Sequence, residues 1–208
     1  MSATLTAPSI ASTPPIANDL SERLYRLDVR QYEEMTRLGI LTESDKVELL
    51  EGLIVAKMTK HGPHIVATGL LQDALTSQLP RGWHVSMQDP IATIDSEPEP
   101  DAKIVRGRRR DYVARHPTAG DVPVVIEVAD TSLSHDRTVK KRIYARGNIQ
   151  TYWIVNLNDR RVEVHEDPTG ARDAPDYRKI TVFAENQTIP VVLDGREVAR
   201  IAVNDLLP

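Results

Sequence analysis

The chain has 208 residues, of which 40% are hydrophobic and 27% are charged, and its formal net charge is −4. This composition is typical of a globular protein and excludes wholesale disorder, while the net charge gives no sign of a polyanionic partner. The sequence contains no cysteine, which excludes thiol catalysis, disulfides, zinc-thiolate sites and iron-sulfur clusters and favours a cytoplasmic location.

Length and hydropathy predict one domain preceded by a tail. A domain typically takes about 150 residues, so this length favours a single core with appendages. Residues 1–22 are rich in proline and nearly uncharged, and they lack the basic and apolar regions of a secretory signal. We therefore expect a disordered tail over 1–22 and a single domain over 23–208. No apolar run reaches the roughly 18 to 20 residues that span a bilayer, so we expect no membrane segment.

The first elements are a short helix and a hairpin. A capping box over residues 28–31 predicts a helix that ends at Gly39. The segment VELLEGLIVAKM, residues 47–58, predicts a β-hairpin, because an acidic-Gly pair between apolar residues favours a tight turn. Alternation along the strand places Glu48 on the face opposite Leu49, and Glu48 by itself is typical of a solvated acid.

Apolar residues at helical spacing predict the longest helix, over residues 62–79. His61 and His64 stand three apart at its start and could present both imidazoles to a metal. Zinc sites normally need a third protein ligand, which nothing in the sequence locates. A histidine-metal hydrolase is therefore kept only as a third hypothesis, beside capping or surface roles for the two histidines.

The charge of the sequence changes from negative to positive at Asp101. Trp83–Met87 and Ala102–Val105 read as strands, separated by the acidic stretch DPIATIDSEPEPD, which ends at Asp101. The segment 103–115 that follows holds six basic residues against one acid. The arginines within residues 106–110 either bind phosphates or form a solvated loop.

A nearly continuous β-branched run, VPVVIEVAD at residues 122–130, predicts a strand covered on both faces at the centre of the sheet. A helix capped by Ser132 or Ser134 is expected to run to Arg146, and TYWIVN at residues 151–156 predicts a second buried strand. A strand, helix and strand of this length indicate a parallel crossover. Later candidate strands, expected as antiparallel decoration of the fold, are Arg161–Glu166, Tyr177–Phe183 and Ile189–Leu193.

Glu127 is an acid within this run of valine and isoleucine. An unpaired buried charge would cost several kcal/mol, so Glu127 needs a partner. One interpretation is an ordinary contact with an arginine or a backbone amide, and the other is a hard divalent cation bound by the carboxylate.

The order of these features resembles the PD-(D/E)XK nuclease superfamily, with an acid on an early hairpin, Pro-Asp before a strand and a glutamate within a buried strand. Over residues 26–164 the chain is similar to the endonucleases of the Uma-two family. The similar segments are VELLEGLIVAKM, the Gly-Pro-His at 62–64, PEPDAKIV, VPVVIEVAD and DRTVKKRIYARGNIQTYWIVN. The resemblance implies an α/β or α+β restriction-endonuclease-like fold, in which helices flank a mixed central sheet with an N-terminal hairpin and C-terminal antiparallel strands.

The resemblance also implies a function and a site. Asp101 and Glu127 would be ligands of Mg²⁺, with Mn²⁺ as a substitute, and Glu48 would hold a metal or a water. Lys140 would orient the nucleophile or stabilise charge. The implied activity is metal-dependent hydrolysis of DNA phosphodiester bonds, and a homodimer would allow both strands of a duplex to be cut.

One position departs from the superfamily pattern. The lysine expected two residues after Glu127 is replaced by Ala129. Lys140 occupies the position that matches the family's lysine, with Lys141 as a rival that points about 100° away on a helix. Tyr144, four residues on, lies on the same stripe as Lys140 and favours it. Ala129 keeps open the alternative of a catalytically inactive nuclease fold that serves as a nucleic-acid-binding or interaction module.

Overall fold

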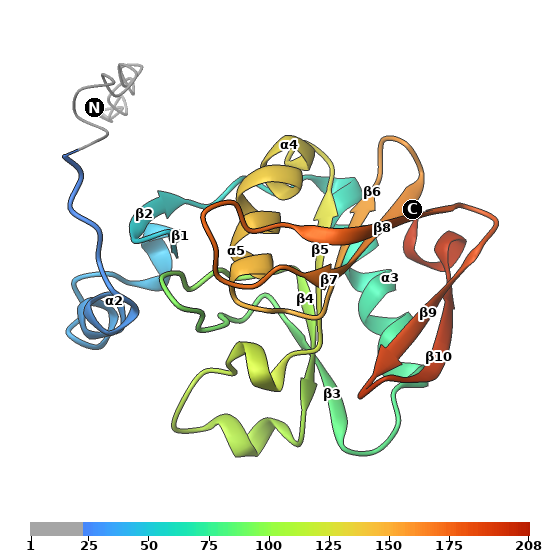
Figure 1. The fold of residues 1–208 in the computed structure, drawn as a ribbon, viewed down its shortest axis with the longest axis horizontal. Coiled ribbons are helices and arrows are strands. Elements are labelled where there is room, and N and C mark those ends of the chain that lie inside the picture. The colour runs from blue at the N-terminus through green and yellow to red at the C-terminus, as the bar shows by residue number, and fades with distance from the viewer. Residues whose placement is uncertain (1–22) are drawn as a thin grey trace, which may run out of the picture.

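A six-stranded mixed sheet forms the centre of the protein (Figure 1). The computed structural model describes residues 23–208, so the predicted tail over 1–22 lies outside the described residues. The strand order is β3-β4-β5-β6-β7-β8. The strands are β3 (Trp83–Met87), β4 (Ala102–Arg106), β5 (Val124–Ala129), β6 (Thr151–Asn156), β7 (Arg161–Pro168) and β8 (Tyr177–Ala184). Strands β5 and β6 are parallel and the other neighbours are antiparallel, which confirms the predicted mixed sheet.

Strand β5 is buried along its whole length, as its β-branched sequence predicts. On one face, Val124, Ile126 and Val128 pack in a core that includes residues of helix α3 (Gly62–Gln78). On the other face, Val125 and Ala129 pack in a core that includes residues of helix α5 (Lys141–Arg146). Because side chains alternate along a strand, Glu127 projects toward the second face, where α5 lies.

The predicted helix over residues 132–146 is interrupted. It consists of α4 (Leu133–His135), a π-helical turn over Asp136–Lys140, and α5. The crossover from β5 to β6 is still parallel, as predicted. A π-helical turn inserts an extra residue into the hydrogen-bond ladder, and such turns are frequent at functional sites.

The two other predicted helices are confirmed. Helix α2 (Val29–Arg37) begins at Asp28, whose carboxylate accepts a hydrogen bond from the Gln31 amide in a capping box. Helix α3 has a proline in its first turn, where the missing amide hydrogen costs nothing. None of the helices within residues 23–208 is long and apolar enough to cross a membrane. Short 3-10 segments are Glu43–Asp45, Arg109–Tyr112, Ala119–Asp121 and Val203–Leu206.

Two hairpins lie outside the central sheet. The predicted N-terminal hairpin is β1 (Val47–Leu50) and β2 (Leu53–Ala56), paired antiparallel. The second is β9 (Thr188–Leu193) and β10 (Arg196–Ala202), and β10 was not predicted, because charged residues interrupt its apolar pattern. The C-terminal strands are antiparallel, as predicted, and β7 and β8 extend the central sheet while β9 and β10 pair only with each other.

The turn of the first hairpin requires Gly52. Its φ is +76°, and a Cβ there would lie 2.6 Å from Cβ of Arg26. Gly52→Ala should lower the free energy of unfolding by at least about 2 kcal/mol, because the left-handed backbone and the steric clash both oppose alanine. Urea denaturation measures this change. Gly195→Ala is the matched control, since its φ is +72° with nothing within 4 Å, and it should cost only about 1 kcal/mol. Equal losses would contradict the steric argument.

Candidate active site

One pocket, with a volume of about 350 Å³, is lined by the four side chains named from the sequence. Glu48 comes from β1, Asp101 precedes β4, Glu127 lies on β5, and Lys140 ends the π-helical turn. All four are buried, with exposures between 5% and 7%. Residues far apart in the sequence are thus brought together by the hairpin, two adjacent strands and the crossover helix.

Lys140 bridges two of the carboxylates. Its Nζ lies 2.8 Å from Oε2 of Glu48 and 3.4 Å from Oε1 of Glu127. Burial by itself lowers the pKa of Lys140, but the charges of Glu127 and Glu48 outweigh this and hold the pKa above its ordinary value. The ammonium therefore stays charged. The neighbouring Lys141 instead pairs with Asp176 at 2.8 Å and does not line the pocket.

Glu127 has hydrogen-bond donors on both of its oxygens. The Tyr144 hydroxyl donates to Oε1 at 2.6 Å, and the backbone amide of Asp101 donates to Oε2 at 3.2 Å. Burial raises the pKa of Glu127 above its ordinary value, with Asp101 adding to the rise, while Lys140 and Tyr144 act against it. Full ionisation of this carboxylate would therefore be favoured by additional positive charge in the pocket.

Asp101 is held by three donors. Its Oδ2 accepts a hydrogen bond from the Val128 amide at 2.9 Å and lies 2.9 Å from Nε2 of His64. Its Oδ1 pairs with Nζ of Lys60 at 3.1 Å. Burial opposes ionisation, but the hydrogen bond and charge of His64, together with Lys60, lower the pKa of Asp101 below its ordinary value. Asp101 is thus poised as a carboxylate.

Several residues that contact the predicted site were not assigned to it from the sequence. His64 was considered only as a metal ligand with His61, and Tyr144 was used only to choose between two lysines, yet both contact the predicted carboxylates. Asp136 was missed altogether. Burial and the charge of Glu127 raise the pKa of Asp136 to about 8, and its Oδ2 accepts a hydrogen bond from Ser132. No local pattern distinguishes Asp136 from a surface acid.

The chemistry of the pocket suits a hard divalent cation. Carboxylate oxygens are the ligands that Mg²⁺ and Mn²⁺ prefer. The acidic lining residues are Glu48, Glu99, Asp101, Glu127, Asp130 and Asp136, and the lysines are Lys57, Lys60 and Lys140.

The three predicted ligands do not form a ready cage. Among residues 23–208, Glu48, Asp101 and Glu127 do not supply three oxygens that all lie within 4.8 Å of one another. Lys140 lies between Glu48 and Glu127, and Asp101 engages His64 and Lys60. The donor types therefore fit a metal, whereas a three-carboxylate site would require these side chains to rearrange.

Two further sequence hypotheses can be compared with the geometry. His61 and His64 both line the pocket, but His64 contacts the Asp101 carboxylate at a distance typical of a hydrogen bond. In the arginine cluster, Arg106 pairs with Asp194 and Arg108 pairs with Asp111. These contacts favour the interpretation of a solvated loop over a phosphate-binding cluster.

The fold and the pocket together define a mixed-sheet α/β protein with an acidic, lysine-containing site at the ends of adjacent strands. The chain belongs to the Uma2 family, described as "Putative restriction endonuclease", which it matches over residues 29–203. This match confirms the family predicted from the sequence segments.

A solved structure supports the fold class. A crystal structure from Anabaena variabilis ATCC 29413, described as "a putative nuclease belonging to DUF820", is similar with a TM-score of 0.62 and 17% sequence identity. The similarity covers 82% of this chain and 94% of that chain. At this identity the comparison supports the fold alone. No curated protein matches the chain.

Proposed function

We propose that the protein is a metal-dependent endonuclease that hydrolyses DNA phosphodiester bonds. The observation that carries the proposal is the charged, buried Lys140 between Glu48 and Glu127, in a pocket that Asp101 also lines. Four buried ionisable side chains are costly to a fold, and such clusters are concentrated at functional sites. The family description adds independent support for a nuclease.

Asp101 and Glu127 would hold Mg²⁺, with Glu48 as a further ligand or as the holder of a water, and Mn²⁺ would substitute. When bound, the ion would neutralise nonbridging phosphate oxygens and lower the pKa of a water. The charge of the pocket supports a bound cation. The pocket has more carboxylates than lysines, so without a divalent ion it would repel the phosphates of DNA.

The other side chains would have supporting roles. Lys140 would stabilise the negative charge that develops on the attacked phosphate, since its ammonium stays protonated. Tyr144 would orient Glu127 through its hydroxyl, and His64 would orient Asp101. Such contacts fix the direction of a ligand oxygen and are typical of residues that surround a metal site.

The departure at Ala129 is compatible with this assignment. Ala129 is fully buried in a core that includes residues of α5, and it supplies no cation to the site. Lys140 reaches the same carboxylate, Glu127, from the helix. We infer that the lysine of the active site is supplied by the crossover helix, and that the inactive alternative is not needed to explain the alanine.

Cleavage of supercoiled plasmid tests the proposal. We expect nicked and linear products in Mg²⁺ or Mn²⁺ and none in EDTA, because the carboxylates need a divalent ion to accept a phosphate. Single-stranded DNA and RNA of matched sequence, run in parallel, measure the preference for DNA. Cleavage that persists in EDTA would contradict the metal dependence. No cleavage of any substrate, together with no binding of Mn²⁺, would favour the inactive module.

A further inference from the structure

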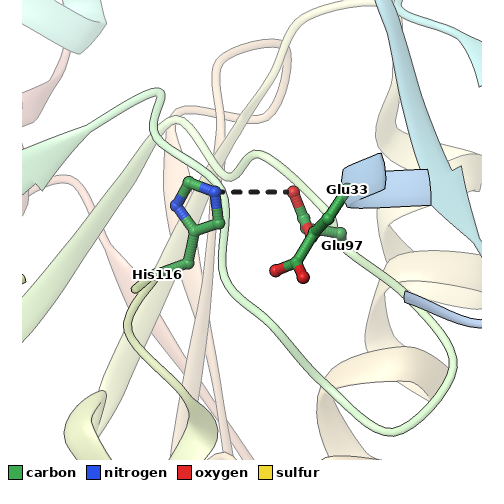
Figure 2. Close-up of side chains that lie close together, drawn as sticks. All are labelled: Glu33, Glu97 and His116. Atoms are coloured by element: carbon green, nitrogen blue, oxygen red, sulfur yellow. Dashed lines mark ion pairs between the residues drawn. The ribbon is translucent and has the colours of Figure 1, made fainter. Parts of the chain in front are cut away.

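A second group of potential metal ligands lies outside the candidate active-site pocket. Glu33 on α2, Glu97 in the segment before β4 and His116 in the loop before the 3-10 turn at Ala119–Asp121 converge from three separate segments (Figure 2). One potential ligand atom from each lies within 4.8 Å of the other two. None of the three lines the pocket that contains Asp101.

The Glu97 carboxylate is buried without adequate partners. Its residue is only 6% exposed, and Oε2 has no hydrogen-bond partner among the described residues. Its Oε1 lies 3.9 Å from Nε2 of His116, the ion pair drawn in Figure 2, which is too long for a hydrogen bond. A buried carboxylate with an unsatisfied oxygen costs free energy unless a cation compensates it.

The charges around Glu97 also favour a bound cation. Burial, Glu33 and Glu99 together raise the pKa of Glu97 to about 7. Glu33 and Glu99 therefore add negative charge near this carboxylate, and His116 is not close enough to donate a hydrogen bond to it. A divalent ion would supply the missing positive charge.

We propose that Glu33, Glu97 and His116 bind a divalent transition-metal ion of the Zn²⁺ class. An imidazole with two carboxylates suits Zn²⁺ better than Mg²⁺, which prefers oxygen ligands alone. Zinc holds its ligands at about 2.0 to 2.2 Å, so the three ligand atoms would close to about 3.5 Å of one another. Glu33 and His116 are exposed and can rotate to do so, while the buried Glu97 stays in place.

The position of Glu97 gives this ion a structural role. The Glu97 amide donates to the Leu49 carbonyl at 2.7 Å, and the Glu99 amide donates to Glu48 Oε2 at 3.0 Å. The stretch 89–101, which contains Glu97, also contacts the loop of His116, because the Ala92 amide donates to the Pro117 carbonyl at 3.0 Å. An ion at Glu97 would therefore tie α2 and the 115–118 loop to the segment that holds Glu48.

Titration calorimetry with Zn²⁺ alone tests the site independently of any nuclease activity. In an Asp101→Asn/Glu127→Gln background, which disables the candidate active site, we expect one equivalent of Zn²⁺ to bind. His116→Ala and Glu97→Gln in that background should each weaken the affinity at least tenfold. His84→Ala is the control, because His84 contacts the Gly107 carbonyl and is not one of the three proposed ligands, and it should leave the affinity unchanged.

Thermal unfolding provides a second readout if the background variant does not fold. Saturating Zn²⁺ should raise the Tm of the unmodified protein and of His84→Ala by more than that of His116→Ala, since an ion that binds only the folded state stabilises it and His116→Ala keeps only the active-site pocket for the ion. Zinc affinity and Tm shifts that are unaffected by both His116→Ala and Glu97→Gln would overturn the proposal. If the protein binds no Zn²⁺, the proposal is likewise overturned, and Glu97 and His116 form only an ion pair.

Discussion

Glu127→Gln should reduce Mg²⁺-dependent DNA cleavage about 100- to 1000-fold while leaving the protein folded. The amide keeps the shape of the side chain and an oxygen that can accept the Tyr144 hydrogen bond. It removes the negative charge that would bind the cation, and lost stabilisation of charge in a buried site typically costs a factor of about 100 to 1000. Initial rates of plasmid nicking, with circular dichroism to verify folding, measure the effect.

The control for this variant is Glu163→Gln on β7. Glu163 is also a buried glutamate, at 6% exposure, but it pairs with Arg137 outside the pocket. Its replacement should leave the cleavage rate within about threefold of the unmodified protein. If both glutamine variants cleave equally well, Glu127 is not a metal ligand and the proposed site is wrong.

The centre of the fold could be predicted because its pattern is local. The β-branched run 124–129 and the strand at 151–156 carry their own periodicity, and the helix between them fits a parallel crossover. The turn at 51–52 is likewise encoded by Gly52, which tolerates left-handed backbone. The family resemblance then placed Glu48, Asp101, Glu127 and Lys140 as candidates, and the structure brings these four to one pocket.

Other features depend on partners that no local pattern specifies. Strands β7 and β8 have the pattern of any antiparallel pair, so their addition to the central sheet follows from long-range packing. The π-helical turn that ends at Lys140 adds one residue to the hydrogen-bond ladder of a segment whose apolar spacing is still typical of a helix. Glu33, Glu97 and His116 come from unrelated segments, so their convergence could not be read from spacing.

Lys140→Met should abolish cleavage and, without metal, lower the free energy of unfolding by about 3 kcal/mol. Removing the ammonium leaves Glu48 and Glu127 as buried acids without their shared cation, and breaking a buried pair from one side typically costs about 3 to 5 kcal/mol. Methionine preserves most of the side-chain volume, so a cavity adds little. Urea denaturation in EDTA and plasmid nicking measure the two effects.

Binding of Mn²⁺ separates a catalytic role from a purely structural one. Lys140→Met should bind Mn²⁺ at least as tightly as the unmodified protein, because the ammonium no longer competes for the Glu48 and Glu127 oxygens. Added Mn²⁺ should then restore stability without restoring cleavage. The neighbouring Lys141→Met removes only a partly exposed pair with Asp176, so it should cost at most about 1 kcal/mol and cleave normally. Restored cleavage in Mn²⁺-loaded Lys140→Met would mean that this lysine only stabilises the metal-free pocket.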